Sequence, residues 1–126
     1  MFLDTVELPD DLEWVDEFTW TPVAQSMEYG ATGALFIQES EKQAGRTITL
    51  EGEEDMCWVP RSTVLALRTL YAQTDNEMTL TLEDERTFQV RFLQSGNPIE
   101  VSPVVKGAFY SDEDYFKIQS IKLIEV

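Results

Sequence analysis

Histidine does not occur among the 126 residues of this sequence. Its absence excludes histidine-based acid–base catalysis, the Ser–His–Asp and Cys–His arrangements, and nearly every zinc site. A nucleophile would need another activating base, and lysine is scarce. No glycine-rich phosphate-binding loop follows a predicted strand. We therefore expect no enzymatic activity, no metal and no cofactor.

Cysteine is also nearly missing. Cys57 is the single one, which excludes an intramolecular disulfide and a CxxC redox pair and favours a reducing, cytoplasmic setting. Acidic residues precede it in the segment EEDMCWV. Because nearby negative charge raises the pKa of a thiol and makes it a poor nucleophile, we predict that Cys57 is a small core residue.

Long apolar runs are lacking as well. No segment approaches the roughly 18 apolar residues of a membrane-spanning helix. The first residues, MFLDTVELPDD, contain no basic region of the kind that begins a signal peptide. We therefore expect a soluble protein that does not insert into membranes.

Basic residues are few, nine against 24 acidic ones, and the formal net charge is −15. Nucleic acids and anionic membranes bind basic surfaces, so both are excluded as specific partners. Two interpretations of the charge remain. The acidic surface either keeps the protein soluble or repels a polyanion that moves past it.

Two acidic clusters could supply oxygen ligands to calcium. Neither has the one-three-five spacing and downstream glutamate of an EF-hand loop, so we expect solvated loops rather than metal sites. The clusters consist of Glu51, Glu53, Glu54 and Asp55, and of Asp112, Glu113 and Asp114.

Apolar residues, by contrast, are plentiful: they make up 43% of the chain, with seven Phe, four Tyr and three Trp. This composition is ample for one folded domain. Alternating apolar and polar residues predict strands, whereas a three- and four-residue apolar period predicts one helix over about residues 62–73. We therefore expect a mainly β (α+β) protein, a β-sandwich or split barrel with one packed α-helix. The predicted strands cover residues 23–30, 33–40, 46–51, 78–83, 87–93, 99–105 and 115–126.

Two segments carry more specific expectations. Residues 1–22 form an N-terminal arm that is acidic but rich in large apolar side chains, and it either folds onto its own core or docks on a neighbouring subunit. Residues 23–126 form a single β-rich domain. Within it, Leu35, Phe36 and Ile37 make a continuous apolar run, which predicts a mostly buried strand.

A family resemblance rests on the order of these elements. RTITLEG is followed by an acidic loop, then WVPRSTVLALRTL, MTLTLEDERTFQVRF, SPVV and a last strand ending in IEV. This order resembles that of the distal tail proteins of long-tailed bacteriophages, to which the tail-tube proteins are related. The resemblance implies a structural virion protein of the tail tip, or baseplate, made in the cytoplasm of the host bacterium. Six copies would form a ring that joins the tail tube to the hub and host-attachment proteins, with the tape-measure protein as a further partner.

A closed ring needs two different patches on each subunit. Our candidates for the subunit interface are the aromatic residues of the arm and one predicted edge strand: Trp14, Phe18, Trp20, Ile99 and Val101. The acidic cluster Glu51, Glu53, Glu54 and Asp55 is the candidate for a lumen through which DNA passes during ejection. Two alternatives stay open. One is a tail-tube or tail-completion protein, and the other is an acidic adaptor or DNA-mimic inhibitor that binds a basic partner.

Overall fold

The computed structural model describes residues 1–42, 45–53, 56–107 and 109–126. These residues form eleven strands and one helix, and all strand pairs are antiparallel. The predicted fold is confirmed: the chain is mainly β, a sandwich of antiparallel sheets with one packed helix. The elements are β1 (Phe2–Leu3), β2 (Val6–Glu7), β3 (Glu13–Trp14), β4 (Val23–Tyr29), β5 (Leu35–Glu41), β6 (Thr47–Glu51), β7 (Trp58–Pro60), α1 (Arg61–Tyr71), β8 (Met78–Thr81), β9 (Thr87–Phe92), β10 (Ile99–Pro103) and β11 (Tyr115–Glu125).

The long last strand, β11, organises the main sheet. It pairs with β6 and β7 along one edge and with β9 and β10 along the other. The register with β10 shifts between Glu100 and Val101, which marks a bulge. Proline at position 103 predicts an edge strand or a bulge, and β10 shows the bulge.

The strands of the core follow the predicted alternation. Ile48 and Leu50 of β6 are buried, whereas the alternate residues Thr47 and Thr49 are partly exposed. In the β8–β9 hairpin, Met78 pairs with Val90 and Leu80 with Phe88. In each of these strands every second side chain points to the same face of the sheet. The apolar side chains of β6, β8 and β9 therefore meet on one face and form the core.

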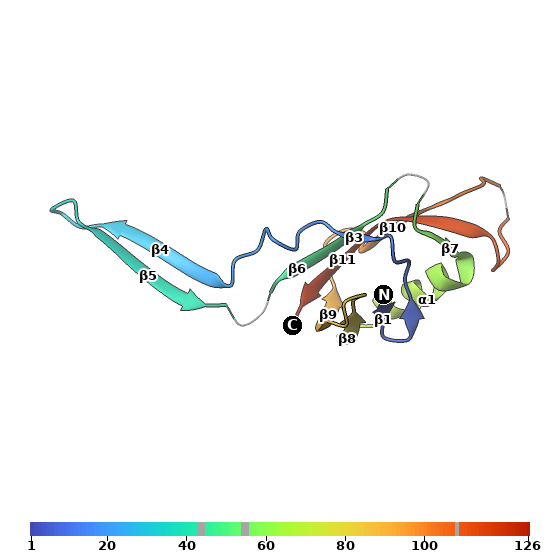
Figure 1. Cartoon of the computed structure of the whole chain (residues 1–126), viewed down its shortest axis with the longest axis horizontal. Coiled ribbons are helices and arrows are strands. Elements are labelled where there is room, and N and C mark those ends of the chain that lie inside the picture. The colour runs from blue at the N-terminus through green and yellow to red at the C-terminus, as the bar shows by residue number, and fades with distance from the viewer. Residues whose placement is uncertain (43–44, 54–55, 108) are drawn as a thin grey trace.

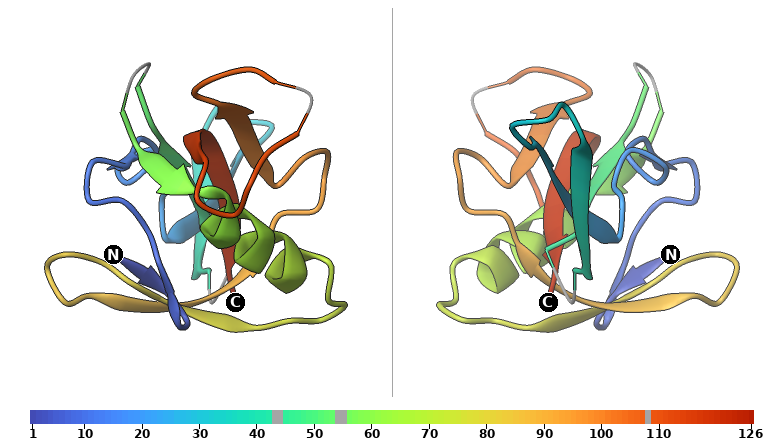
Figure 2. Two further views of the ribbon diagram at one scale, coloured as in Figure 1. Left: turned by 90° about the vertical axis from the view of Figure 1, so that its right-hand side faces the viewer. Right: turned by 90° about the vertical axis from the view of Figure 1, so that its left-hand side faces the viewer.

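Helix α1 buries Leu67 completely and packs against β2, β7 and β11 (Figure 2). Pro60 and Ser62 predict a helix start within a residue or two of these positions, and the helix begins at Arg61 with Pro60 in the N-cap position. The helix begins without a side-chain cap. Instead, the backbone carbonyls of Asp114 and Asp112 accept hydrogen bonds from the N–H groups of Arg61 (2.8 Å) and Ser62 (3.1 Å).

The first half of the N-terminal arm belongs to this core. Strand β1 pairs with β2 and β8, and β3 pairs with β6. Leu3 and Leu8 are 0% and 1% exposed, and Leu12 is buried as well. Of the two alternatives for this segment, packing onto its own core therefore describes residues 1–14.

The hairpin of β4 and β5 extends from one end of the long axis as a separate two-stranded sheet (Figure 1). Its two strands and their bend near Gly33 agree with the prediction. The predicted burial of Leu35, Phe36 and Ile37 is wrong, since 45%, 60% and 50% of these side chains are exposed. An apolar run alone therefore does not show that a strand lies in the core of its own chain.

Candidate interaction surfaces

Two tryptophans of the N-terminal arm lie against one arginine. The Arg46 guanidinium lies 4.6 Å from the ring centroid of Trp14 and 5.9 Å from that of Trp20, and it donates a hydrogen bond to the Glu17 carbonyl oxygen at 2.6 Å. The Trp14 ring also packs edge-on against Phe88, with centroids 5.4 Å apart. These contacts attach the arm to β6 and β9, so docking of Trp14 on another subunit would require them to open.

Of the other residues of the N-terminal arm, some bind the arm to the core and others are exposed to solvent. The Asp16 carboxylate accepts hydrogen bonds from the Thr49 backbone N–H (2.8 Å) and hydroxyl (3.0 Å), which fixes the arm to β6. The Phe18 side chain, by contrast, is 90% exposed. Of the three aromatic residues predicted as an interface, Phe18 is therefore the one whose ring is free to contact a partner.

Arg46→Ala is expected to lower the free energy of unfolding by about 2 kcal/mol, because it removes a hydrogen bond from a charged donor and the stacking on two indole rings. Urea unfolding followed by tryptophan fluorescence measures this loss. Arg91→Ala is the matched control. Arg91 makes one exposed ion pair, with Asp75 at 3.4 Å, and its loss should cost less than about 0.5 kcal/mol. Equal effects of the two variants would contradict the anchoring role of Arg46.

The candidate interface residues of β10 face the core. Ile99 pairs with Ile121 and Val101 with Ile118, and both β10 side chains pack against buried residues. Each keeps an intermediate exposure. A partner that adds to β10 would thus meet its backbone edge more than these two side chains.

The acidic loop after β6 is partly described. Glu51 and Glu53 are exposed, while Glu54 and Asp55 lie outside the described residues. Glu51 stands directly opposite Glu13 in the β3–β6 pairing. Like charges in such positions destabilise a strand pair, so these carboxylates are kept at a cost in stability.

Cys57 lies beneath this loop and is 1% exposed, which confirms the predicted core position. Burial raises the pKa of its thiol to about 12, and the Asp11 carboxylate adds to the rise. The same Asp11 accepts a hydrogen bond from the Cys57 backbone N–H at 3.1 Å, which lowers the pKa of the carboxyl group. A thiol with so high a pKa stays protonated at neutral pH and is a poor nucleophile.

The second acidic cluster has a structural role. Its backbone carbonyls cap α1, as described above, and the Asp114 carboxylate accepts a hydrogen bond from the Ser111 N–H at 2.8 Å. The Asp112 carboxylate lies 3.6 Å from the Arg61 guanidinium. Within the described ranges, no group of three or more acidic or cysteine side chains could hold a metal ion.

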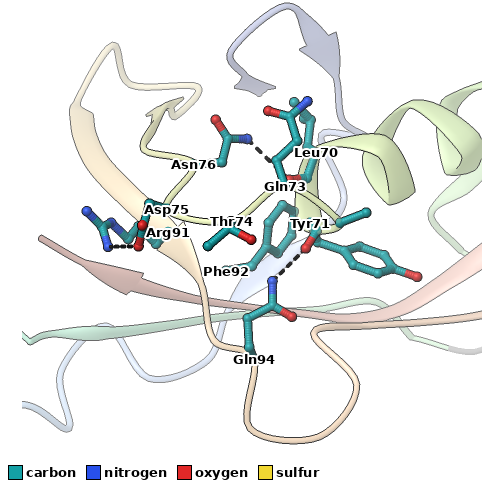
Figure 3. A pocket seen from close by; sticks show the side chains of 10 residues that line it. Leu70, Tyr71, Gln73, Thr74, Asp75, Asn76, Arg91, Phe92 and Gln94 are labelled. Atoms are coloured by element: carbon teal, nitrogen blue, oxygen red, sulfur yellow. Dashed lines mark hydrogen bonds and ion pairs between the residues drawn. The ribbon is translucent and has the colours of Figure 1, made fainter.

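A hollow of about 450 Å³ lies at the other end of α1, between the helix, the following turn and β9 (Figure 3). Two amide side chains point into it and complete the helix end. Asn76 donates to the Leu70 carbonyl oxygen at 3.2 Å, and Gln94 donates to that of Tyr71 at 2.7 Å. These two amide groups therefore satisfy carbonyls of the last helical turn, which is a structural role.

A different hollow, of about 500 Å³, lies at the end of the molecule remote from the hairpin and is mostly apolar. Trp58 and Tyr115 contribute two neighbouring rings to it, with centroids 6.3 Å apart and planes tilted by 40°, and Val104 and Val105 line it further. We did not predict this hollow, because its wall combines β7 with the segment before β11. The apolar residues themselves were visible in the sequence, but their meeting depends on the β7–β11 pairing.

In the part of the chain that the structure describes, no helix has the length and apolarity to cross a membrane. Comparison with known proteins finds no matching family model, no matching curated protein and no matching solved structure.

Proposed function

We propose that this protein is a structural component of a phage tail tip, which forms a homo-oligomeric ring between the tail tube and the hub or host-attachment proteins. The observation that carries this proposal is the β4–β5 hairpin, an apolar strand pair exposed to solvent on a folded β-sandwich. Exposed apolar surface of this extent is typical of protein–protein contact sites. The lack of histidine and the protonated, buried Cys57 thiol favour assembly over catalysis.

Two experiments test the proposed ring. Negative-stain images of the purified protein, with its mass from light scattering, should show closed rings of about six copies. Antibodies against the protein should label one end of the tails of the corresponding phage particles. Labelling along the whole tail would instead indicate a tail-tube protein, and a monomer that binds a basic protein with steep salt dependence would indicate the DNA-mimic alternative.

The acidic loop gives the ring a further expected property. Glu51 and Glu53 are exposed beside Glu13, and this concentration of negative charge would keep DNA from adhering to a lumen. Exchange of Glu51, Glu53 and Glu54 for Gln and of Asp55 for Asn should leave ring assembly intact but impair DNA ejection.

DNA release from particles triggered in vitro, followed with a DNA-binding dye, measures this effect. The matched control removes four exposed carboxylates elsewhere, through Gln at Glu7, Glu77, Glu85 and Glu100. Ejection at the normal rate from the loop variant would contradict the lumen role, and impairment by both variants would show that only total charge matters.

A further inference from the structure

One face of the β4–β5 hairpin carries a compact apolar group near its tip. Met27 pairs with Ile37 and Tyr29 with Leu35, and residues paired directly across an antiparallel ladder lie on the same face. Their exposed fractions are 61%, 50%, 77% and 45%. We call these four side chains the tip face.

The opposite face of the hairpin differs. Phe36 on that face folds over Gly30, where an added Cβ would lie 2.8 Å from the phenyl ring. Ser26 and Gln38 are paired neighbours on the same side. The hairpin therefore has one face that is apolar at its tip and an opposite face on which Phe36, 60% exposed, is the one large apolar side chain.

The hairpin lacks cover from its own chain. An isolated two-stranded hairpin is marginally stable in water at best, and three or more strands or a packed helix are needed for independent stability. Within the described residues, β4 and β5 pack extensively on each other, and neither makes a comparable contact with another element. A single side-chain hydrogen bond, from Gln25 to Glu39 at 2.7 Å, supplements their backbone pairing.

The charge pattern agrees with a covered surface. Charged residues make up 26% of the chain, yet Glu28 is the only one between Phe18 and Gln38. The centres of protein–protein interfaces are depleted in charged residues in the same way. In this strongly acidic protein the tip of the hairpin is thus almost uncharged, whereas Glu39 and Glu41 lie toward its base.

The same chain offers an apolar acceptor at its opposite end. The hollow is lined by Trp58, Val104, Val105 and Tyr115. Strand β7 and the segment between β10 and β11, which supply these residues, lie at the end of the long axis opposite the hairpin (Figure 1). Tyr110 supports its wall by packing on Phe116, with centroids 5.2 Å apart. Two unlike patches at opposite ends are the geometry of head-to-tail association.

The surface area is consistent with two such contacts per copy. A monomeric protein of 14.5 kDa has an accessible surface of about 6,900 Å². This chain exposes 8390 Å², which is about 1,500 Å² more. A standard interface buries about 800 Å² on each partner, so a subunit with one neighbour on either side buries about 1,600 Å².

We infer that the tip face of one copy docks into the apolar hollow of the next copy, so that the chains associate head to tail. The inference rests on the proposed ring-forming function and names the contact residues of that ring. It assigns the contact to Met27, Tyr29, Leu35 and Ile37 on one side and to Trp58, Val105 and Tyr115 on the other.

Light scattering tests the donor side. The wild type should form oligomers, and Ile37→Glu should raise the dissociation constant roughly tenfold or more. Gln38→Glu is the matched control, because it adds the same charge one residue away on the other face, and it should change the constant far less. Since β5 lies outside the core, both variants should keep the circular dichroism spectrum and melting temperature of the wild type.

Higher salt should strengthen association, because copies of charge −15 repel each other.

A disulfide trap tests the acceptor side. A Leu35→Cys copy mixed with a Val105→Cys copy should give a cross-linked dimer under mild oxidation, whereas Gln38→Cys with Val105→Cys should not. Both engineered sites are exposed, and the native Cys57 is buried. A cross-link of equal yield in the control pair, or none in the test pair, would overturn the assigned acceptor.

The outcomes separate this contact from the proposed function. A wild type that stays monomeric at about 1 mM would overturn docking on a second copy and direct the search to another protein. Rings that persist in Ile37→Glu would overturn the tip-face contact and leave the ring function standing. Hairpin-dependent oligomers that form open chains and label no tail would support the contact and refute the tail-tip function.

Discussion

Gly52→Ala is expected to lower the free energy of unfolding by about 3 kcal/mol. A Cβ at this position would lie 2.4 Å from the Ile118 backbone oxygen and 2.7 Å from the Cys57 sulfur. The Gly52 N–H donates a hydrogen bond to the Gln119 carbonyl oxygen at 3.0 Å. Residue 52 therefore cannot move away from β11 without losing this bond, and the atom it would strike is backbone rather than a flexible side-chain end.

Gly107→Ala is the matched control for this substitution. The nearest atom to its added Cβ, the Phe109 backbone oxygen, lies at 3.8 Å, an ordinary contact distance. Urea unfolding at pH 7 should show a change within about 0.5 kcal/mol for this variant. A Gly52→Ala protein as stable as Gly107→Ala would mean that β11 moves aside at little cost.

The close approach at Gly52 could not be predicted from the sequence, although the elements that create it could. The strand before Gly52 and the long final strand follow from local alternation of apolar and polar residues. Which residue of one strand lies opposite which residue of the other depends on register over a long sequence separation. Gly52 therefore looked like the start of an acidic turn, whereas it is a packing position against Ile118.

The hairpin shows a second limit of sequence reasoning. The alternation of apolar and polar residues in β6 and in β8–β9 predicts the buried residues correctly, because one face of each strand is exposed to solvent. The run Leu35–Phe36–Ile37 has the pattern of a strand covered on both sides, yet all three side chains are exposed in the single chain. A run of apolar residues is typical both of a strand in the core of its own chain and of a strand in a subunit interface. The sequence pattern does not distinguish the two.

The candidate interface residues illustrate the same point from the other side. The sequence favours Trp14 and Trp20 as interface residues, because no residue near them in the arm is an evident packing partner. Arg46, directly before β6, supplies one at 4.6 Å and 5.9 Å from the two rings. The cation that stabilises both indoles comes from more than twenty residues away in sequence, so no pattern within the arm could reveal it.

The stability of the protein is expected to fall at alkaline pH because of Cys57. Its thiol has a pKa of about 12 in the folded chain, against an ordinary value of 9.0, and burial is the main cause. Because the pKa is higher in the folded state, the thiol of the unfolded chain ionises first as the pH rises. The contribution of the protonated thiol to the free energy of unfolding is therefore complete below about pH 9 and is lost as the pH rises toward 12. Each pKa unit corresponds to about 1.4 kcal/mol, so the loss attributable to this thiol should reach about 2 kcal/mol at pH 10.5.

Cys57→Ala isolates this contribution, because lysine and tyrosine side chains titrate alike in both proteins. The variant should be less stable than the wild type at pH 7, where it lacks the buried sulfur, but its free energy of unfolding should fall less between pH 8 and pH 10.5. Asp11→Asn should lower the pKa of the thiol in the folded state, because the carboxylate that faces the sulfur loses its charge. Equal alkaline losses in wild type and Cys57→Ala, measured by urea unfolding, would show that the thiol ionises without cost in the folded chain. Gly52 packs against the same sulfur. If neither Gly52→Ala nor Cys57→Ala lowered the free energy of unfolding, the junction of β6 and β11 would be loosely packed.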